Sequence, residues 1–364
     1  MKRLIISVVC VIGSYMSNDF IVKNNQSLRN GIEIMRRKKT ILIFPGQGSQ
    51  YVGMGKELYD KFKLVRDIYD EASKVLGYDM SELCFKKHKF GKLMHKADLN
   101  KTIYTQPAVL TMSYACYRVL DETCKENDVD LNVSLLAGHS LGEYTALLVA
   151  EALDFETALA LVMKRATVMT EWGNSYPGAG LMAVVDKGKK LDYDKICALC
   201  KDFGVFITLN NTKSQIVVGG SKRRLGEMGK ELKSNGLRSM MLKVEGPFHT
   251  PIMKPAADKF KRELEKCDMD IALKPIISNV TTEAIVDPEH IKKELYKQMF
   301  NIVDWRGVIE RIISKGENTF IEVGPKQVLS NMIKDIDPSV LRLNLEDTES
   351  LKKTVKKMAE QGEA

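Results

Sequence analysis

The segment that most restricts the fold of this chain is a five-residue turn between an apolar stretch and a helical one. Residues 133–137 have the composition of a buried strand, and Gly138-His139-Ser140-Leu141-Gly142 follows directly. After the turn, apolar side chains recur with helical spacing over residues 143–153. The glycines of a G-x-S-x-G turn permit the sharp change from strand to helix that lifts the serine into an exposed, strained position. The segment therefore predicts a strand–turn–helix unit with Ser140 as a nucleophile.

Two other segments follow the same order. Residues 40–44 lead into Pro45-Gly46-Gln47-Gly48, and residues 319–323 lead into Gly324-Pro325. Apolar strands that run into helices through tight turns are typical of a parallel sheet in an α/β protein. Within residues 173–246, short β-like and helical segments alternate in the order β-α-β-α-β. This order indicates a small α+β subdomain inserted into the larger one.

We therefore expect four parts in the chain. Residues 1–39 form a targeting leader, and residues 40–172 and 247–347 together form the large α/β subdomain. The inserted subdomain covers residues 173–246, and residues 348–364 form a charged tail that is a solvated helix.

The positive charge of the chain is concentrated in the leader. The 364 residues include 55 Lys and Arg against 47 Asp and Glu, but residues 1–39 hold eight basic and two acidic ones, which leaves +2 for the rest. The body therefore lacks the basic surface expected of a nucleic-acid-binding protein. Its apolar runs are shorter than the roughly 18–20 residues that span a bilayer. We expect a monomer with no nucleic-acid partner and no stable membrane association.

The leader has the order of a bipartite targeting signal. Lys2 and Arg3 precede an apolar core at residues 4–13 and small polar residues at 14–17, as in a signal peptide. Residues 18–40 are rich in Asn and basic residues and poor in acidic ones, as in a transit peptide. This combination resembles the two-step address of proteins imported into a secondary plastid of the apicoplast kind. A mitochondrial presequence or a wrongly assigned start is the alternative.

Only two of the seven cysteines have a recognisable spacing, Cys197 and Cys200. No second Cys/His pair lies nearby to complete a zinc site, and residues 193–203 have the pattern of an amphipathic helix. We therefore predict that both thiols are packing residues and that the chain holds no metal there.

A serine hydroxyl needs a base, and His249 is the best placed of the five histidines. It lies in Gly246-Pro247-Phe248-His249-Thr250-Pro251, directly after the last strand expected in the inserted subdomain. Two prolines restrict this loop, which suits a fixed catalytic side chain. His139 lies within the turn itself, and we expect it to point away from Ser140.

Arg165 lies on an apolar stripe of a helix predicted over residues 155–172, with Asp154 as the N-cap. The stripe has 4-3-4 spacing and consists of Ala158, Val162, Arg165 and Met169. Because an unpaired buried charge is very unfavourable, this arginine needs an anion. The anion is either a carboxylate of the protein or a carboxylate of the substrate. The planar guanidinium can hold such a carboxylate by two hydrogen bonds.

The glycine-rich segment at residues 45–50 does not fit a nucleotide-binding loop. Gly46, Gly48 and Gly53 have the spacing G-x-G-x4-G, and Gly55-Lys56-Glu57 lacks the Ser or Thr of a P-loop. A loop of this kind can instead supply a backbone N–H to an oxyanion.

Five motifs occur in a fixed order over residues 40–345. They are Phe44-Pro45-Gly46-Gln47-Gly48-Ser49-Gln50, Thr105-Gln106-Pro107-Ala108, Gly138-His139-Ser140-Leu141-Gly142-Glu143-Tyr144, Pro247-Phe248-His249 and Glu322-Val323-Gly324-Pro325. Together they resemble the malonyl-CoA:acyl carrier protein transacylase family of type II fatty-acid synthesis. The resemblance implies an α/β-hydrolase-like core of parallel strands with an inserted ferredoxin-like subdomain.

The resemblance also implies roles for individual residues. Ser140 is the nucleophile, His249 its base and Arg165 the partner of the malonyl carboxylate, while the backbone N–H groups of Gln47 and Leu141 form the oxyanion hole. Gln106, and Asn210 or Asn211, resemble residues of the substrate pocket. Phe248 together with Leu141 resembles the malonyl-type rather than the methylmalonyl-type pocket. A backbone carbonyl within residues 301–305 steers His249, and Asp304 lies where relatives carry Gln or Arg.

The resemblance further implies an acyltransferase that needs no cofactor. Malonyl-CoA is the donor and acyl carrier protein the acceptor, and malonyl-serine is the intermediate. Because carrier protein is acidic, we expect basic residues to dock it, with Lys222-Arg223-Arg224 and Lys187-Gly188-Lys189-Lys190 as the candidates.

Two other functions use the same residues. A serine esterase or thioesterase of α/β-hydrolase type would need an acidic third residue between serine and histidine, and the available aspartates are Asp186, Asp192, Asp194 and Asp202. Such an enzyme has no need of Arg165. A non-catalytic carrier-protein-binding subunit would not need Ser140, His249 and Arg165 together.

Overall fold

The computed structural model describes residues 39–86, 98–186 and 190–362. The leader predicted at residues 1–39 lies outside these ranges except for Lys39, and Lys187, Gly188 and Lys189 of the second basic candidate lie outside them as well. In the part of the chain that is described, no helix is both long and apolar enough to cross a membrane.

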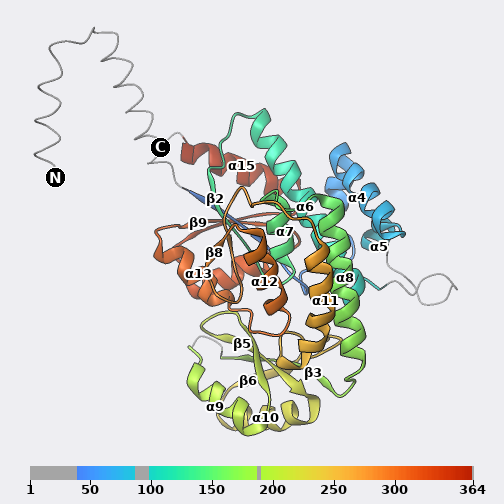
Figure 1. Ribbon diagram of the computed structural model, residues 1–364. Helices are drawn as coiled ribbons and strands as arrows, with labels where there is room; N and C mark the ends of the chain where they lie inside the picture. The colour runs from blue at the N-terminus through green and yellow to red at the C-terminus, as the bar shows by residue number, and fades with distance from the viewer. Residues whose placement is uncertain (1–38, 87–97, 187–189, 363–364) are drawn as a thin grey trace, which may run out of the picture.

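The main sheet has six strands in the order β10-β9-β1-β2-β7-β8 (Figure 1). All neighbours are parallel except β7 and β8, which confirms the predicted α/β class. The strands are β1 (Thr40–Phe44), β2 (Val133–Gly138), β7 (Ile276–Ile277), β8 (Ala284–Ile285), β9 (Thr319–Val323) and β10 (Leu341–Leu345). The three segments predicted as strands are the adjacent strands β9, β1 and β2, so the turns that follow them meet at one edge.

Helices cover both faces of this sheet. In β1, Leu42 and Phe44 pack into the larger hydrophobic core, whereas Ile41 and Ile43 pack on the opposite face against α13 and α14. This alternation explains why the strand is apolar at every position from Ile41 to Phe44. The helices are α3 (Lys56–Lys61), α4 (Lys63–Leu76), α5 (Met80–Phe85), α6 (Thr102–Glu126), α7 (Gly142–Val149), α8 (Phe155–Asn174), η1 (Pro251–Met253), α11 (Lys254–Lys266), α12 (Pro288–Gln298), α13 (Trp305–Ser314), α14 (Val328–Ile336) and α15 (Thr348–Gly362).

A second, antiparallel sheet has the strand order β4-β5-β3-β6. Its elements are β3 (Ala179–Val185), α9 (Tyr193–Phe203), β4 (Phe206–Asn210), β5 (Gln215–Ser221), α10 (Lys222–Ser234) and β6 (Arg238–Met241). They lie within the segment predicted as an insertion, but β4 was not predicted, so the order is β-α-β-β-α-β and not β-α-β-α-β. Figure 1 shows α9 and α10 on the face of this sheet that is turned away from the larger one.

The faces of the small sheet have separate partners. Met182 and Val184 pack against α9 and α10, in a cluster that also buries Cys200 and contacts Cys197, so the predicted packing role of the two thiols is confirmed. Leu181 and Ala183 point the other way and join the larger core. The small sheet is therefore packed directly on the body that carries the strand–turn–helix unit.

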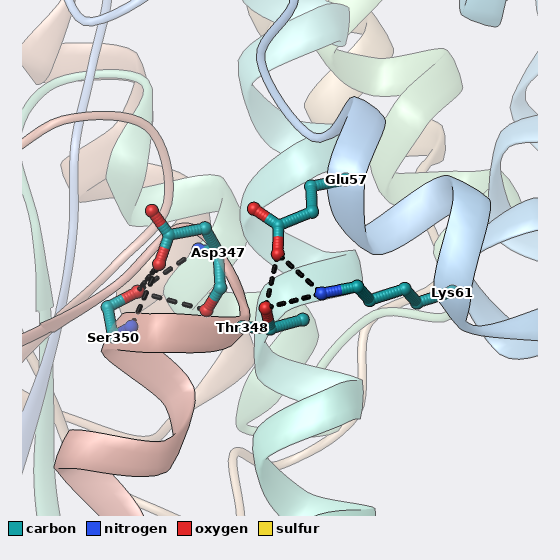
Figure 2. A network of polar contacts seen from close by, with 5 residues as sticks. All are labelled: Glu57, Lys61, Asp347, Thr348 and Ser350. Atoms are coloured by element: carbon teal, nitrogen blue, oxygen red, sulfur yellow. Dashed lines mark hydrogen bonds and ion pairs between the residues drawn. The ribbon is translucent and has the colours of Figure 1, made fainter.

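The C-terminal segment differs from the prediction of a solvated tail. It is a helix, α15, but Leu351, Val355 and Met358 are buried in the larger core. Figure 2 shows how its first turn is attached: Lys61 Nζ donates to Thr348 Oγ1 at 2.8 Å and to Glu57 Oε1 at 2.7 Å. Its charged residues lie on the face opposite these buried side chains. The helix is therefore a packed part of the fold.

Candidate active site

Ser140 lies at the apex of the turn between β2 and α7, in a left-handed backbone conformation with φ of 50°. The backbone passes so close to itself that a Cβ on Gly138 would lie 1.9 Å from the Gly142 carbonyl carbon, and a Cβ on Gly142 would lie 2.0 Å from the Phe44 oxygen. Asn279 fixes the turn from the end of β7, because its Oδ1 accepts the Ser140 N–H at 2.7 Å and its Nδ2 donates to the Gly138 carbonyl at 2.7 Å. The strained conformation predicted for Ser140 is therefore present.

Ser140 and His249 form a hydrogen-bonded pair. Ser140 Oγ lies 2.8 Å from His249 Nε2, and His249 Nδ1 lies 2.7 Å from the backbone carbonyl of Gln298. Because a carbonyl only accepts hydrogen bonds, we assign the hydrogen to Nδ1, which leaves Nε2 free to accept the serine proton. The pair thus has the geometry of a nucleophile and its general base.

The carbonyl that orients His249 is not in the segment expected from the resemblance. We expected it within residues 301–305, but it belongs to Gln298, the last residue of α12. Asp304 has a structural role instead. It is the N-cap of α13, where its Oδ1 accepts the Gly307 N–H at 3.0 Å, and it also accepts Asn210 Nδ2 at 2.7 Å.

The environment of His249 keeps its ring neutral. Burial and the positive charge of Arg165 lower the pKa of His249 to about 3, although the hydrogen bond to the Gln298 carbonyl opposes this shift. At neutral pH the imidazole is therefore unprotonated and able to act as a base. His139 points elsewhere, as predicted, and its Nε2 lies 2.9 Å from Asn211 Oδ1.

Arg165 is fully buried on α8, and the other members of its stripe, Ala158, Val162 and Met169, are buried with it. Its Nη1 donates to Gln106 Oε1 at 2.8 Å, and its Nη2 donates to Gln298 Oε1 at 2.9 Å and to Ser140 Oγ at 3.0 Å. All three acceptors are neutral. Among the described residues no carboxylate forms an ion pair with Arg165, and its Nε has no hydrogen-bond partner.

A buried guanidinium whose hydrogen-bond acceptors are all neutral has lost its hydration without a carboxylate in direct contact, which is unfavourable. Burial accordingly lowers the pKa of Arg165. Of the two alternatives for its anion, the structure therefore disfavours a protein carboxylate. An anionic group of a ligand would supply the missing charge next to Ser140.

A cavity of about 100 Å³ lies over Ser140. It is lined by Gln47, Gln106, His139, Ser140, Leu141, Arg165, Met169, Leu181, Leu209, Leu242, Val244, Phe248 and His249. The predicted pocket residues Gln47, Gln106, Leu141 and Phe248 are thus brought together with the catalytic pair. Asn211 is not in this lining. Its side chain instead bonds to His139, which does line the cavity, and to Gln215, so a pocket role for Asn211 stays a prediction.

The backbone N–H groups of Gln47 and Leu141 meet the requirements of an oxyanion hole. Both residues line the cavity, and within the described structure neither N–H has a hydrogen-bond acceptor. The side chain of Gln47 donates to Thr102 Oγ1 at 3.1 Å, which anchors its loop. Two free donors beside the nucleophile are what a developing oxyanion needs.

Sequence reasoning missed Gln298 and Asn279. Gln298 ends an amphipathic helix and belongs to no motif, so no local signal marks it. Asn279 follows the two apolar residues of β7, and a polar residue at the carboxyl end of a parallel strand is the only signal that could have found it.

These features define an enzyme that forms an acyl-serine intermediate. They are a neutral histidine, a strained serine and two free N–H donors. The partner of His249 Nδ1 is a carbonyl, so Asp186, Asp192, Asp194 and Asp202 do not complete a triad. Within the described residues, no cluster of His, Cys, Asp and Glu is suited to a metal ion.

Comparisons with known proteins agree with this class. The profile of the family described as "Acyl transferase domain" matches residues 41–356. A Bacillus subtilis (strain 168) protein named malonyl CoA-acyl carrier protein transacylase is 35% identical over 330 residues, which cover 89% of this chain and 99% of that protein. The crystal structure of malonyl CoA-acyl carrier protein transacylase from Clostridium perfringens is 35% identical with a TM-score of 0.79, covering 88% of this chain and 98% of that one.

A further structure contains a type II PKS acyl-carrier protein in complex with its malonyl-transacylase. It is 34% identical to this chain with a TM-score of 0.80 and covers 88% of this chain and 100% of that one. The chain belongs to the acyl transferase domain family and, within it, to the malonyl CoA-acyl carrier protein transacylases.

Proposed function

We propose that this chain transfers the malonyl group from malonyl-CoA to the phosphopantetheine thiol of acyl carrier protein, through a malonyl ester of Ser140. One observation carries the proposal. Arg165 is buried, no carboxylate among the described residues contacts it directly, and its Nη2 lies 3.0 Å from the Ser140 oxygen. An acyl group on Ser140 that ends in a carboxylate would bring its negative charge to this guanidinium.

The first half-reaction loads the enzyme. His249 Nε2 takes the proton of Ser140 Oγ as that oxygen attacks the thioester carbonyl of malonyl-CoA. The N–H groups of Gln47 and Leu141 stabilise the tetrahedral oxyanion, each by roughly 3–4 kcal/mol. As the C–S bond breaks, His249 returns the proton to the CoA thiolate, and malonyl-serine remains.

The second half-reaction runs through the same groups. The phosphopantetheine thiol of carrier protein gives its proton to His249 and attacks the ester carbonyl of malonyl-Ser140. Collapse of the intermediate breaks the bond to Oγ, and His249 protonates the serine. The Nδ1 bond to the Gln298 carbonyl keeps the ring in place in both halves.

Selectivity follows from the pocket. An acetyl group leaves Arg165 without its anion, whereas malonyl forms a charge-assisted pair there. Phe248 and Leu141 line the small cavity and would crowd a methyl branch on the α-carbon. We therefore propose a preference for malonyl over acetyl and over methylmalonyl groups.

Intact-protein mass tests the proposal. Residues 40–364 are mixed with malonyl-CoA or with acetyl-CoA, and the adduct is measured for the wild type and for the variants Ser140→Ala and Arg165→Ala. We expect a malonyl adduct that is lost in Ser140→Ala, and little acetyl adduct unless Arg165 is changed. Equal labelling by both donors would contradict the role of Arg165, and no labelling by either would contradict the acyl-serine mechanism.

We propose that the basic residues Lys222, Arg223 and Arg224 at the start of α10 dock the acidic carrier protein. Arg223 forms an exposed ion pair with Glu227, and Arg224 Nη1 donates to the Gly204 carbonyl at 3.3 Å, so both charges remain at the surface. Charge reversal of the three residues should slow transfer to carrier protein and leave malonyl-serine formation from malonyl-CoA unchanged. Unchanged transfer with unchanged salt dependence would reject this surface.

We also propose that the enzyme acts as a monomer, with no nucleic-acid partner and no stable membrane association. We further propose that the basic leader directs import into a plastid, with a mitochondrial destination as the alternative. The family profile begins at residue 41, which supports a separate function for the residues before it. Residues 1–39 fused to a fluorescent protein should carry it to the plastid. Retention of the fusion in the cytosol would contradict a targeting role.

A further inference from the structure

The proposed mechanism leaves one buried carboxylate near Ser140 unused. Glu143, on α7, is only 4% exposed. Its Oε1 accepts the Asn279 backbone N–H at 2.6 Å, and its Oε2 accepts a hydrogen bond from Gln298 Nε2. Burial raises the pKa of Glu143, while these two N–H donors and the charge of Arg165 oppose the rise.

Gln298 connects this carboxylate to Arg165. A glutamine amide has a donor end and an acceptor end, and in this arrangement both oxygens of Glu143 face N–H donors. Gln298 therefore turns Nε2 toward Glu143 and toward the Ser140 carbonyl, which lies at 2.9 Å. Its Oε1 is left to accept Arg165 Nη2 at 2.9 Å. The opposite orientation would bring oxygen against oxygen at Glu143 and at the Ser140 carbonyl, and an N–H donor against the guanidinium.

We propose that Glu143 is a positioning residue for Arg165: it sets the orientation of the Gln298 amide, and that amide holds the guanidinium beside the acyl-binding side of Ser140. The consequence is selectivity, because a misplaced guanidinium would lose the carboxylate of malonyl and would not affect a neutral acetyl group. This inference rests on the proposed function, in which Arg165 pairs with the malonyl carboxylate.

Glu143→Gln tests the inference, because it replaces one carboxylate oxygen by an NH2 group and keeps the size of the side chain. A glutamine at this position cannot accept at both ends, so either Asn279 or Gln298 loses its acceptor. We expect the ratio of kcat/KM for malonyl-CoA to that for acetyl-CoA, measured as acyl-serine formation, to fall roughly tenfold. Most of the loss should appear as a higher KM for malonyl-CoA, with acetyl transfer little changed.

Glu322→Gln is the matched control. Glu322, on β9, is fully buried as well, and its two oxygens accept the backbone N–H groups of Leu329 and Ser330 at 2.9 and 2.7 Å. It makes no contact with Arg165 or Gln298, so its replacement should leave the malonyl-to-acetyl ratio unchanged. Equal ratios in the two variants would overturn the proposal.

A double-variant cycle separates positioning from a general structural effect. In the Arg165→Ala background, Glu143→Gln should no longer change the malonyl-to-acetyl ratio. A further tenfold change in that background would overturn the proposal. If Glu143→Gln does not fold, Gln298→Leu removes the same amide but keeps the carbonyl that holds His249, and it should lower the ratio in the same way; an unchanged ratio there would count against it.

The outcomes also distinguish this inference from the proposed function. A wild-type enzyme that forms no malonyl-serine would contradict the function itself. Normal malonyl-serine formation, with one ratio shared by the wild type and Glu143→Gln, would contradict only the role of Glu143.

Discussion

Ser140 and His249 both adopt left-handed backbone conformations, with φ of 50° and 61°. Each such conformation in a residue other than glycine costs about 1–3 kcal/mol. Neighbouring contacts hold them in place: Asn279 binds the Ser140 N–H, and Thr250 Oγ1 donates to the Pro247 carbonyl at 2.6 Å beneath His249. At the scale of residues, the reactive pair therefore depends on backbone positions that the surrounding loops maintain.

The low pKa of His249 predicts an unusual acid limb. The neutral ring is the active form, so a pKa lowered to about 3 by burial and by Arg165 keeps the base active as the pH falls below the ordinary histidine value. The rate at which a small neutral fluorophosphonate modifies Ser140 should hence stay high down to about pH 5. In Arg165→Ala the limb should move to higher pH, because one of the causes is removed.

Circular dichroism over the same pH range serves as the control for unfolding. A wild-type limb centred near the ordinary value of about 6.5 would show that neither burial nor Arg165 perturbs the base. An identical limb in the wild type and Arg165→Ala would remove Arg165 as a cause while leaving burial.

At the scale of elements, the turn after β2 is formed by close backbone approach. The backbone oxygen of Phe44, the last residue of β1, would lie only 2.0 Å from a Cβ placed on Gly142. Because the obstacle is backbone, no side-chain movement relieves the clash. The strand, the turn and the first residue of α7 thus pack as one unit.

Two glycine substitutions, one at a crowded position and one at an open position, test this close packing. Gly142→Ala should lower the free energy of unfolding by at least about 2 kcal/mol and abolish acylation of Ser140, since the turn must move. Gly226→Ala, in exposed α10 with no atom within 4 Å of the new Cβ, should raise it by about 0.5–1 kcal/mol. Urea unfolding of both variants measures the difference, and a tolerated Gly142→Ala would contradict the packing described.

The sequence allowed correct prediction of elements that carry a complete local signal. Strands β1, β2 and β9 are mostly apolar and run into glycine-containing turns, and Arg165 interrupts an otherwise apolar helical stripe. Strands β7 and β8 have two residues each, too few for a periodic pattern, and β4 is a short strand between α9 and β5 that was not predicted. Gln298 reaches the site only because α12 ends there, which is a tertiary fact that local spacing does not contain.

At the scale of the whole molecule, the cavity depends on both sheets. Ser140 and Arg165 come from the large body, whereas Leu181 on β3 and Leu209 on β4 form part of the wall from the small sheet. The inner face of the small sheet is also part of the larger core. The size of the acyl pocket is consequently set by how the insertion packs on the body.

The same dependence on packing decides the role of α15, which was predicted to be a solvated tail. Its Leu351, Val355 and Met358 follow helical spacing and are at most 9% exposed. Their periodicity was present in the sequence, but the many lysines around them on the outer face concealed it. If the helix belongs to the core, its apolar face and its polar attachment should contribute very different amounts to stability.

Leu351→Ala and Met358→Ala should therefore each lower the free energy of unfolding by about 2–5 kcal/mol, as expected for large-to-small changes in a core. Thr348→Ala, which removes the exposed contact with Glu57 and Lys61 drawn in Figure 2, should lower it by no more than about 1 kcal/mol. Urea unfolding of the three variants, with the same slope in each, gives the comparison. Losses below about 0.5 kcal/mol for both core positions would mean that the helix is held only at its first turn and that the prediction of a solvated tail was nearer the truth.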